Sequence, residues 1–154
     1  MNRAAAEAFL AEPRILLLAV NREEKEPFLV AVWHEYRDGR FLIWSAAGDA
    51  KVTLVRRNPA VTLCVQDERR PYKSVLVRGR AEVVPGLDRD LARRLVARYV
   101  DSESSGPYLS WIDSEPEASN VTIVVTPTAW RAADYAEGRE SADHAPWVTD
   151  ANFR

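Results

Sequence analysis

The sequence is poor in the side chains that most often carry out chemistry. Its 154 residues include one cysteine, Cys64, and two histidines, His34 and His144. A single cysteine excludes an intramolecular disulfide and favours a reducing compartment, and this set is too small for a usual zinc site. Because Cys64 has no base nearby in the sequence, we interpret it as a small buried residue, not a nucleophile. For His34, which follows Trp33 on a predicted strand, a polar role at the sheet edge is favoured over catalysis.

An excess of positive charge and long apolar runs are also absent. The 21 lysines and arginines are outnumbered by 23 acids, for a formal net charge of -2, so general attraction to nucleic acid or anionic lipid is not expected. No apolar run approaches the length of a membrane span, and "MNRAAAEAFLAEP" has the spacing of an amphipathic helix instead of a signal peptide. We therefore expect a cytoplasmic protein without nucleic-acid or membrane partners.

The sequence also lacks the common catalytic motifs. It contains no Gly-x-Ser-x-Gly and no phosphate-loop sequence, and its carboxylates are scattered. We predict no metal site and no catalytic side chain. Either the protein only binds a ligand, or a cofactor supplies the reactivity.

What the chain does contain is a series of strand patterns joined by short turns. The run "RILLLAV" predicts a strand buried on both faces, whereas "SVLVRGRAEVV" alternates between apolar and polar residues. The apolar residues from Leu87 to Val100 recur at helical spacing. Strands are predicted at 14–20, 28–36, 40–45, 60–66, 74–84 and 121–135, and helices at 2–12, 49–57 and 87–100, with one helical turn at 107–111. This pattern favours a mainly β domain with helical additions over residues 1–135, followed by a tail at 136–154.

One stretch, "WSAAGDAKVTLVRRNPAVTLCV" (44–65), gathers cations around small residues. Ser45 precedes the turn, Lys51 lies on the first turn of the predicted helix, and Arg56 and Arg57 lie at its far end. Backbone N–H groups at a helix start attract phosphate. The residues alone leave two interpretations open, an anion site and a surface helix with solvated cations.

Residues 6–131 resemble the split β-barrel family of flavin- and deazaflavin-binding proteins, the pyridoxamine 5'-phosphate oxidase-like group. The resemblance lies in the order of "FLAEPRILLLAV", "PFLVAVWHEYRDGRFLIWS", "GDAKVTLVRRNPAVTLCV" and "RPYKSVLVRGRAEVV". The segment "RRNPAVTLCVQDERRPYKSVLVRGRAEV" is most similar to the branch described as coenzyme F420-dependent. The resemblance implies a six-stranded antiparallel Greek-key barrel of the FMN-binding type. It also implies a homodimer with a cofactor in each of two interface grooves.

The resemblance further implies which residues bind the cofactor. The ring would pack against one strand, the phosphate would lie near the helix start, and a third segment would line the groove from one subunit or its partner. In that order the residues are Ala31, Val32 and Trp33; Ser45, Lys51 and Arg57; and Tyr72, Lys73 and Ser74.

The sequence departs from the family pattern at Asp49 and Thr53, where many deazaflavin-binding relatives carry further basic residues. A carboxylate near a phosphate is unfavourable unless it caps the helix. The cofactor therefore stays open between F420 and FMN. The function stays open between an oxidoreductase that transfers hydride to a small conjugated substrate, a non-catalytic flavin or haem binder, and a dimeric interaction protein. Oxidation of pyridoxal-type substrates is not expected, because the substrate-phosphate residues of the true oxidases find no match.

The five tryptophans offer two further interpretations. Trp44 and Trp130 are interpreted as core or interface residues, while Trp33 is open between core and ligand contact. Trp111 is placed in a loop that could cover a substrate pocket.

Overall fold

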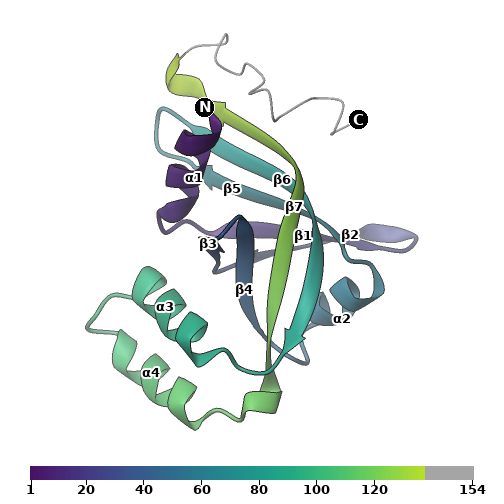
Figure 1. The fold of residues 1–154 in the computed structure, drawn as a ribbon, viewed down its shortest axis with the longest axis vertical. Helices are drawn as coiled ribbons and strands as arrows, with labels where there is room; N and C mark the ends of the chain where they lie inside the picture. The colour runs from purple at the N-terminus through teal and green to yellow at the C-terminus, as the bar shows by residue number, and fades with distance from the viewer. Residues whose placement is uncertain (138–154) are drawn as a thin grey trace.

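The computed structural model describes residues 1–137, which form one antiparallel sheet and four α-helices (Figure 1). The tail predicted from residue 136 onward lies outside the described residues except for 136–137. The strands are β1 (Leu16–Arg22), β2 (Lys25–Val32), β3 (Glu35–Arg37), β4 (Arg40–Ala46), β5 (Ala60–Asp67), β6 (Lys73–Pro85) and β7 (Asn120–Asp134). The α-helices are α1 (Arg3–Ala11), α2 (Ala50–Arg57), α3 (Arg89–Tyr99) and α4 (Ser105–Ser114), and the 3-10 turns are η1 (Glu117–Ser119) and η2 (Tyr135–Glu137).

The sheet has the strand order β2-β1-β5-β6-β7-β4-β3, with every neighbouring pair antiparallel. Figure 1 shows the long strands β6 and β7 curving through the molecule, with α1 near one end and the α3–α4 pair near the other. This confirms the mainly β prediction with helical additions. Within residues 1–137, however, the edge strands β2 and β3 do not pair with each other, so the predicted barrel is not closed within one chain.

The predicted strand at 28–36 is in fact two strands, which raises the number from six to seven. The chain leaves β2 after Val32 and enters β3 at Glu35. At His34 the backbone N–H donates to the hydroxyl of Tyr99 at 3.3 Å, and the same hydroxyl lies 3.1 Å from the His34 carbonyl oxygen. A side chain from α3 thus accepts from a backbone N–H that a continuous strand would pair with its neighbour.

The main core lies on one face of the sheet, where alternate residues of β1, β4, β5 and β6 are buried. In β1 these are Leu16, Leu18 and Val20, which share one core cluster with Ala6, Phe9 and Leu10 of α1. The residues between them on β1, Leu17 and Ala19, are only half-buried. The prediction that this strand is buried on both faces is therefore wrong for a single chain.

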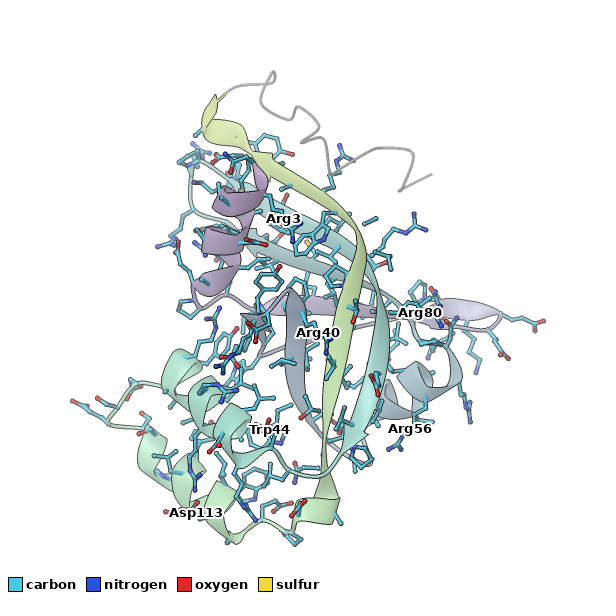
Figure 2. The ribbon with its side chains drawn as sticks, viewed as in Figure 1. Arg3, Arg40, Trp44, Arg56, Arg80 and Asp113 are labelled. Carbon is cyan, nitrogen blue, oxygen red and sulfur yellow. The ribbon has the colours of Figure 1, made fainter. Side chains whose placement is uncertain are left out.

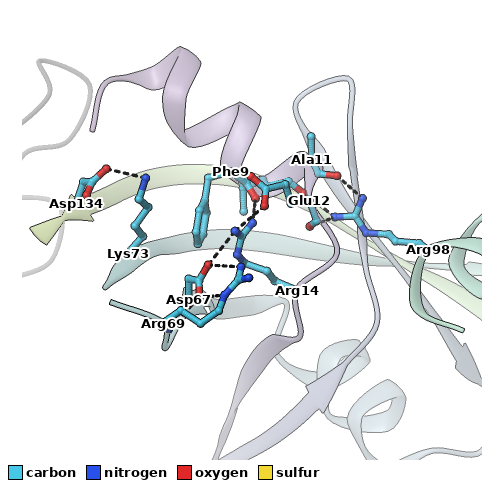
Figure 3. Close-up of polar contacts among 10 residues, drawn as sticks. Phe9, Ala11, Glu12, Arg14, Asp67, Arg69, Lys73, Arg98 and Asp134 are labelled. Atoms are coloured by element: carbon cyan, nitrogen blue, oxygen red, sulfur yellow. Dashed lines mark hydrogen bonds and ion pairs between the residues drawn. The ribbon is translucent and has the colours of Figure 1, made fainter. Parts of the chain in front are cut away.

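Two arginines donate hydrogen bonds to the backbone carbonyl groups at the end of α1 (Figure 3). Arg14 donates to Phe9 O at 2.7 Å, while Arg98 of α3 donates to Leu10 O at 2.8 Å, to Ala11 O at 2.6 Å and to Glu12 O. The last carbonyls of a helix have no partner within it, and cations there also oppose the helix dipole. These contacts fix α1 to both β1 and α3.

The α3–α4 pair packs around a second, smaller apolar cluster. The cluster contains Leu87, Ala92, Val96 and Ile112, with Trp33 and Trp44 packed against it. Helix α4 has ten residues where the sequence predicts a loop with one helical turn. Its Pro107 lies in the first turn, where the missing N–H has no partner to lose. Among residues 1–137, no helix has both the length and the apolar character that a membrane span needs.

Candidate functional site

A pocket of about 460 Å³ opens where β2, β4, α2 and α3 meet. It is lined by Ile15, Ala31, Val32, Trp33, Trp44, Lys51 and Leu95. Of these described residues, Lys51 alone is ionisable. The pocket is therefore an apolar, partly aromatic space with one cation at its wall.

Trp33 is held in place by an aromatic stack on α3. Its ring lies 5.3 Å from the ring of Tyr99, with an angle of 5° between the planes. The Tyr99 hydroxyl donates to the carbonyl of Arg14 at 2.8 Å and lies 3.1 Å from His34 Nδ1. Tyr108 of α4 lies 6.0 Å from Trp33 on a tilted plane. Fixed at both ring and hydroxyl, Tyr99 orients the indole that lines the pocket.

Trp44 forms the second aromatic wall, between the sheet and the α3–α4 pair (Figure 2). Its Nε1 donates to Asn120 Oδ1 at 2.9 Å, and its ring lies 5.3 Å from that of Trp111. Trp111 lies on α4 and not in a loop, three residues after Tyr108, so both side chains project from the same side of the helix. They are 43% and 44% exposed, respectively, behind the two tryptophans that line the pocket.

His34 is fully buried and not at an exposed sheet edge as the sequence suggested. Burial, and to a lesser degree the charge of Arg98, lowers the pKa of His34 to about 3. Its Nε2 has no hydrogen-bond partner among the described residues. The neutral imidazole supports Tyr99 and lies outside the set that lines the pocket.

Ser45, Asp49 and Lys51 form one cluster at the start of α2. Asp49 Oδ2 accepts from the Ser45 hydroxyl at 2.8 Å and also from the Lys51 ammonium. Lys51, and to a lesser degree Ser45, lowers the pKa of Asp49 below its ordinary value, against the effect of partial burial. Asp49 occupies the capping position, but its side chain makes no capping hydrogen bond to the described helix. Capping by this side chain, the condition under which a carboxylate near a phosphate would be favourable, is therefore not met in the described helix.

The structure brings together only part of the predicted site within one chain. Ala31, Val32, Trp33 and Lys51 line the pocket, and Ser45 joins Lys51 through Asp49. Arg57 is exposed at the opposite end of α2 from Lys51. The remaining three, Tyr72, Lys73 and Ser74, lie where β6 begins, and Lys73 forms an ion pair of 3.1 Å with Asp134 (Figure 3). For all nine predicted residues, a role at the cofactor stays a prediction.

Sequence reasoning missed three residues that line the pocket, Ile15, Trp44 and Leu95. Leu95 belongs to the apolar stripe predicted for the helix at 87–100, and Ile15 belongs to the apolar run "RILLLAV". Both patterns mark a residue as apolar and ordered, but neither indicates which surface it faces. Only the crossing of α3 over β2 and β4 places them together.

A larger hollow of about 640 Å³ adjoins the pocket at Ile15. Its charged wall includes Arg14 and Arg69, and both donate to the carboxylate of Asp67, at 3.0 and 2.9 Å (Figure 3). Those hydrogen bonds, with that of Arg69 the stronger, lower the pKa of Asp67. The lining of the hollow also contains two further acids, Glu12 and Glu68, and no aromatic side chain. It is therefore a weaker candidate for a planar, anionic ligand than the pocket beside Lys51.

The fold of this chain has known relatives. The family model described as pyridoxamine 5'-phosphate oxidase matches residues 2–133. A solved F420 reductase is 27% identical, with a TM-score of 0.63, over 80% of this chain and 94% of that one. A conserved hypothetical protein from Mycobacterium tuberculosis is 21% identical, with a TM-score of 0.71, over 87% of this chain and 85% of that one.

An FAD-binding protein from Mesorhizobium loti is 23% identical, with a TM-score of 0.63, over 84% of this chain and 92% of that one. The search of curated proteins found no match. At these identities the solved structures mainly establish the shared fold. The family model covers most of the sequence, and the chain belongs to the pyridoxamine 5'-phosphate oxidase family.

Proposed function

We propose that this protein is an oxidoreductase that binds a flavin or deazaflavin, FMN or coenzyme F420, and uses it to transfer hydride to or from a small conjugated substrate. One observation carries the proposal, the meeting of an aromatic, apolar pocket with Lys51 at the start of α2. A planar ring fits the first feature and a phosphate the second. The F420 reductase and FAD-binding protein among the structural relatives are consistent with it.

In this proposal each part of the pocket has one task. Ala31, Val32 and Trp33 pack against the ring, and Lys51 and Ser45 bind the phosphate with the N–H groups at the start of α2. Arg57 adds positive charge further along the phosphate-bearing chain. When bound, the cofactor supplies the hydride chemistry, and the protein excludes water and orients the substrate between aromatic walls.

We further propose that the working unit is a homodimer of the domain formed by residues 1–135. The outer face of β2-β1-β5-β6 carries an apolar row in register, Ala31, Leu17, Cys64 and Leu76. Leu29 of β2 is 61% exposed on the same sheet. A second copy over this face would bury the row, complete the barrel and bring Tyr72, Lys73 and Ser74 to the groove.

The decisive experiment is a binding titration of the Lys51→Ala variant with F420 and with FMN, followed by cofactor absorbance and tryptophan fluorescence. Loss of a charge-assisted phosphate contact is expected to weaken binding by about 1.5–3 kcal/mol, on the order of ten- to a hundredfold in Kd. Lys25→Ala is the matched control, because Lys25 is exposed on β2 away from the pocket. Equal affinity of wild type and Lys51→Ala would refute the assignment.

A second candidate is a protein that binds the same cofactor without turnover. It is favoured by the pocket lining, where Lys51 is the single ionisable group among the described residues. The two functions differ in one measurement. An oxidoreductase reoxidises its bound, reduced cofactor faster when a conjugated acceptor is added, whereas a carrier protein does not.

A further inference from the structure

The cation proposed to bind the cofactor's phosphate already has an anionic partner within the chain. One oxygen of Asp49, Oδ2, accepts both the Ser45 hydroxyl and the Lys51 ammonium. These are the two side chains that a phosphate at this position would use. The carboxylate thus lies where a phosphate oxygen would have to be.

Asp49 is close to both Ser45 and Lys51 in the sequence. It is the residue before the first turn of α2, and it lies two residues from Lys51 and four from Ser45. Its carboxylate therefore shares the helix start with any bound anion. Two anions at van der Waals distance repel, and the repulsion is larger in a partly buried site than in water.

Exposure indicates which member of the pair can move. The Lys51 side chain is 13% exposed, whereas that of Asp49 is 42% exposed. Ser45 is buried on β4. If the Asp49 side chain rotates toward solvent, water solvates its carboxylate. The Lys51 ammonium, by contrast, would have to move out of the pocket wall. The aspartate is thus the group that an incoming phosphate displaces.

We propose that Asp49 is an internal competitor for the cofactor's phosphate and sets how much that phosphate contributes to binding. In the unloaded protein its carboxylate occupies the phosphate position on Ser45 and Lys51, and it must leave before the phosphate binds. The inference rests on the proposed function. Its consequence is weak discrimination between a phosphorylated cofactor and the same ring system without phosphate.

The test measures the ratio of dissociation constants for riboflavin and FMN, which differ by the phosphate, in wild type and in Asp49→Asn. The ratio for F420 and its ribityl deazaflavin, which lacks the phosphate and the tail attached to it, is measured in the same way. Asparagine can still accept from Ser45 but no longer carries the competing charge. In the ring system that the protein binds, we expect the ratio to rise about tenfold, through tighter binding of the phosphorylated form, the scale of one charge-assisted hydrogen bond.

Two variants control the measurement. Asp38→Asn removes the same charge from an exposed turn with positive φ, which asparagine tolerates, and should leave the ratio unchanged. Asp49→Ser removes the carboxylate with a residue favoured at a helix start, so that poor folding of one variant does not decide the result. It should raise the ratio as asparagine does.

The possible failures are distinguishable. If wild type binds a flavin or deazaflavin and neither Asp49 variant changes the ratio, the competitor role is overturned while the proposed function stands. If no variant binds any of the four ligands, both are overturned. The competitor role would also be overturned if the double variant Asp49→Asn/Lys51→Met kept the raised ratio. The tighter binding of the phosphorylated form must depend on Lys51.

Discussion

At the scale of single residues, His34 links the support of the pocket to the stability of the protein. The imidazole is buried beside the hydroxyl of Tyr99, the residue that stacks on Trp33. Its pKa is about 3 in the folded chain, against an ordinary value of 6.5. The folded protein therefore keeps His34 neutral at pH values where the unfolded chain would protonate it.

This difference predicts acid sensitivity that begins near neutrality. Above about pH 6.5 the His34 imidazole is neutral in both the folded and the unfolded chain, so its contribution to the free energy of unfolding is constant. Below that pH the unfolded chain binds a proton at His34 and the folded chain does not. The free energy of unfolding therefore falls by up to about 1.4 kcal/mol for each unit by which the pH is lowered. Urea unfolding between pH 7 and 4.5 should show this slope in wild type and a flatter one in His34→Gln. His144→Gln is the control. The same slope in wild type and His34→Gln would contradict the burial of a neutral histidine.

At the scale of elements, β6 and β7 approach each other closely at Gly79. The strand pairing shifts register between Arg78 and Gly79. A Cβ at residue 79 would lie 2.7 Å from Val125 Cγ1 and 2.8 Å from Thr126 O. The second of these atoms belongs to the backbone, which cannot move without disturbing the ladder. The glycine in "VRGRA" thus marks a close approach between two strands.

We expect Gly79→Ala to destabilise the protein by about 1–3 kcal/mol, because overpacking here displaces backbone. Gly106→Ala is the matched control, since a Cβ at residue 106 meets nothing within 4 Å in the described structure and lies in α4. It should be neutral or stabilising by up to about 1 kcal/mol. Thermal unfolding of both variants against wild type decides the matter, and equal stability of the two would refute the close approach.

The elements that sequence reasoning found are those whose patterns are local. The alternation in "SVLVRGRAEVV" and the helical spacing after Leu87 each depend only on neighbours in the chain. The break between β2 and β3 depends on Tyr99, which is 65 residues from His34, and no local pattern carries that information. Helix α4 was missed because "SGPY" is typical of a turn, although proline is tolerated in a first helical turn.

The same distinction holds for the candidate site. Lys51 stands out in the sequence as a cation on the first turn of a predicted helix. The family resemblance marks Trp33, and Asp49 is a departure from the family pattern. The side-chain rotamer of Asp49 decides whether its carboxylate contacts Lys51 or the N–H groups of the helix, and the structure shows the contact with Lys51. The sequence fixes neither this rotamer nor the placement of Trp44 at the pocket wall.

At the scale of the whole molecule, the sheet is covered on one face and open on the other. The inward residues of β1 belong to the main core, while Leu17 lies between Ala31 and Cys64 on the outer face. Monomeric proteins seldom leave a continuous apolar patch of this kind exposed. The open face is the surface over which the proposed dimer would form.

Leu17→Arg should therefore convert a dimer into a monomer and weaken cofactor binding in parallel, because a charge would be buried without a partner. Light scattering after size-exclusion chromatography measures the mass, and the cofactor titration measures the binding. Ala118→Arg, exposed on η1, is the control. A wild-type protein that is monomeric at micromolar concentration would contradict the dimer before any variant is made.

The contacts at the end of α1 bear on the order in which the chain can fold as it is synthesised. The first helix leaves the ribosome early, but three carbonyls at its end await Arg98, which lies 86 to 88 residues later. Until α3 has been made, these groups can be satisfied only by water. We expect α1 to acquire its native surroundings only after α3 has been made, although it precedes the other described elements in the chain.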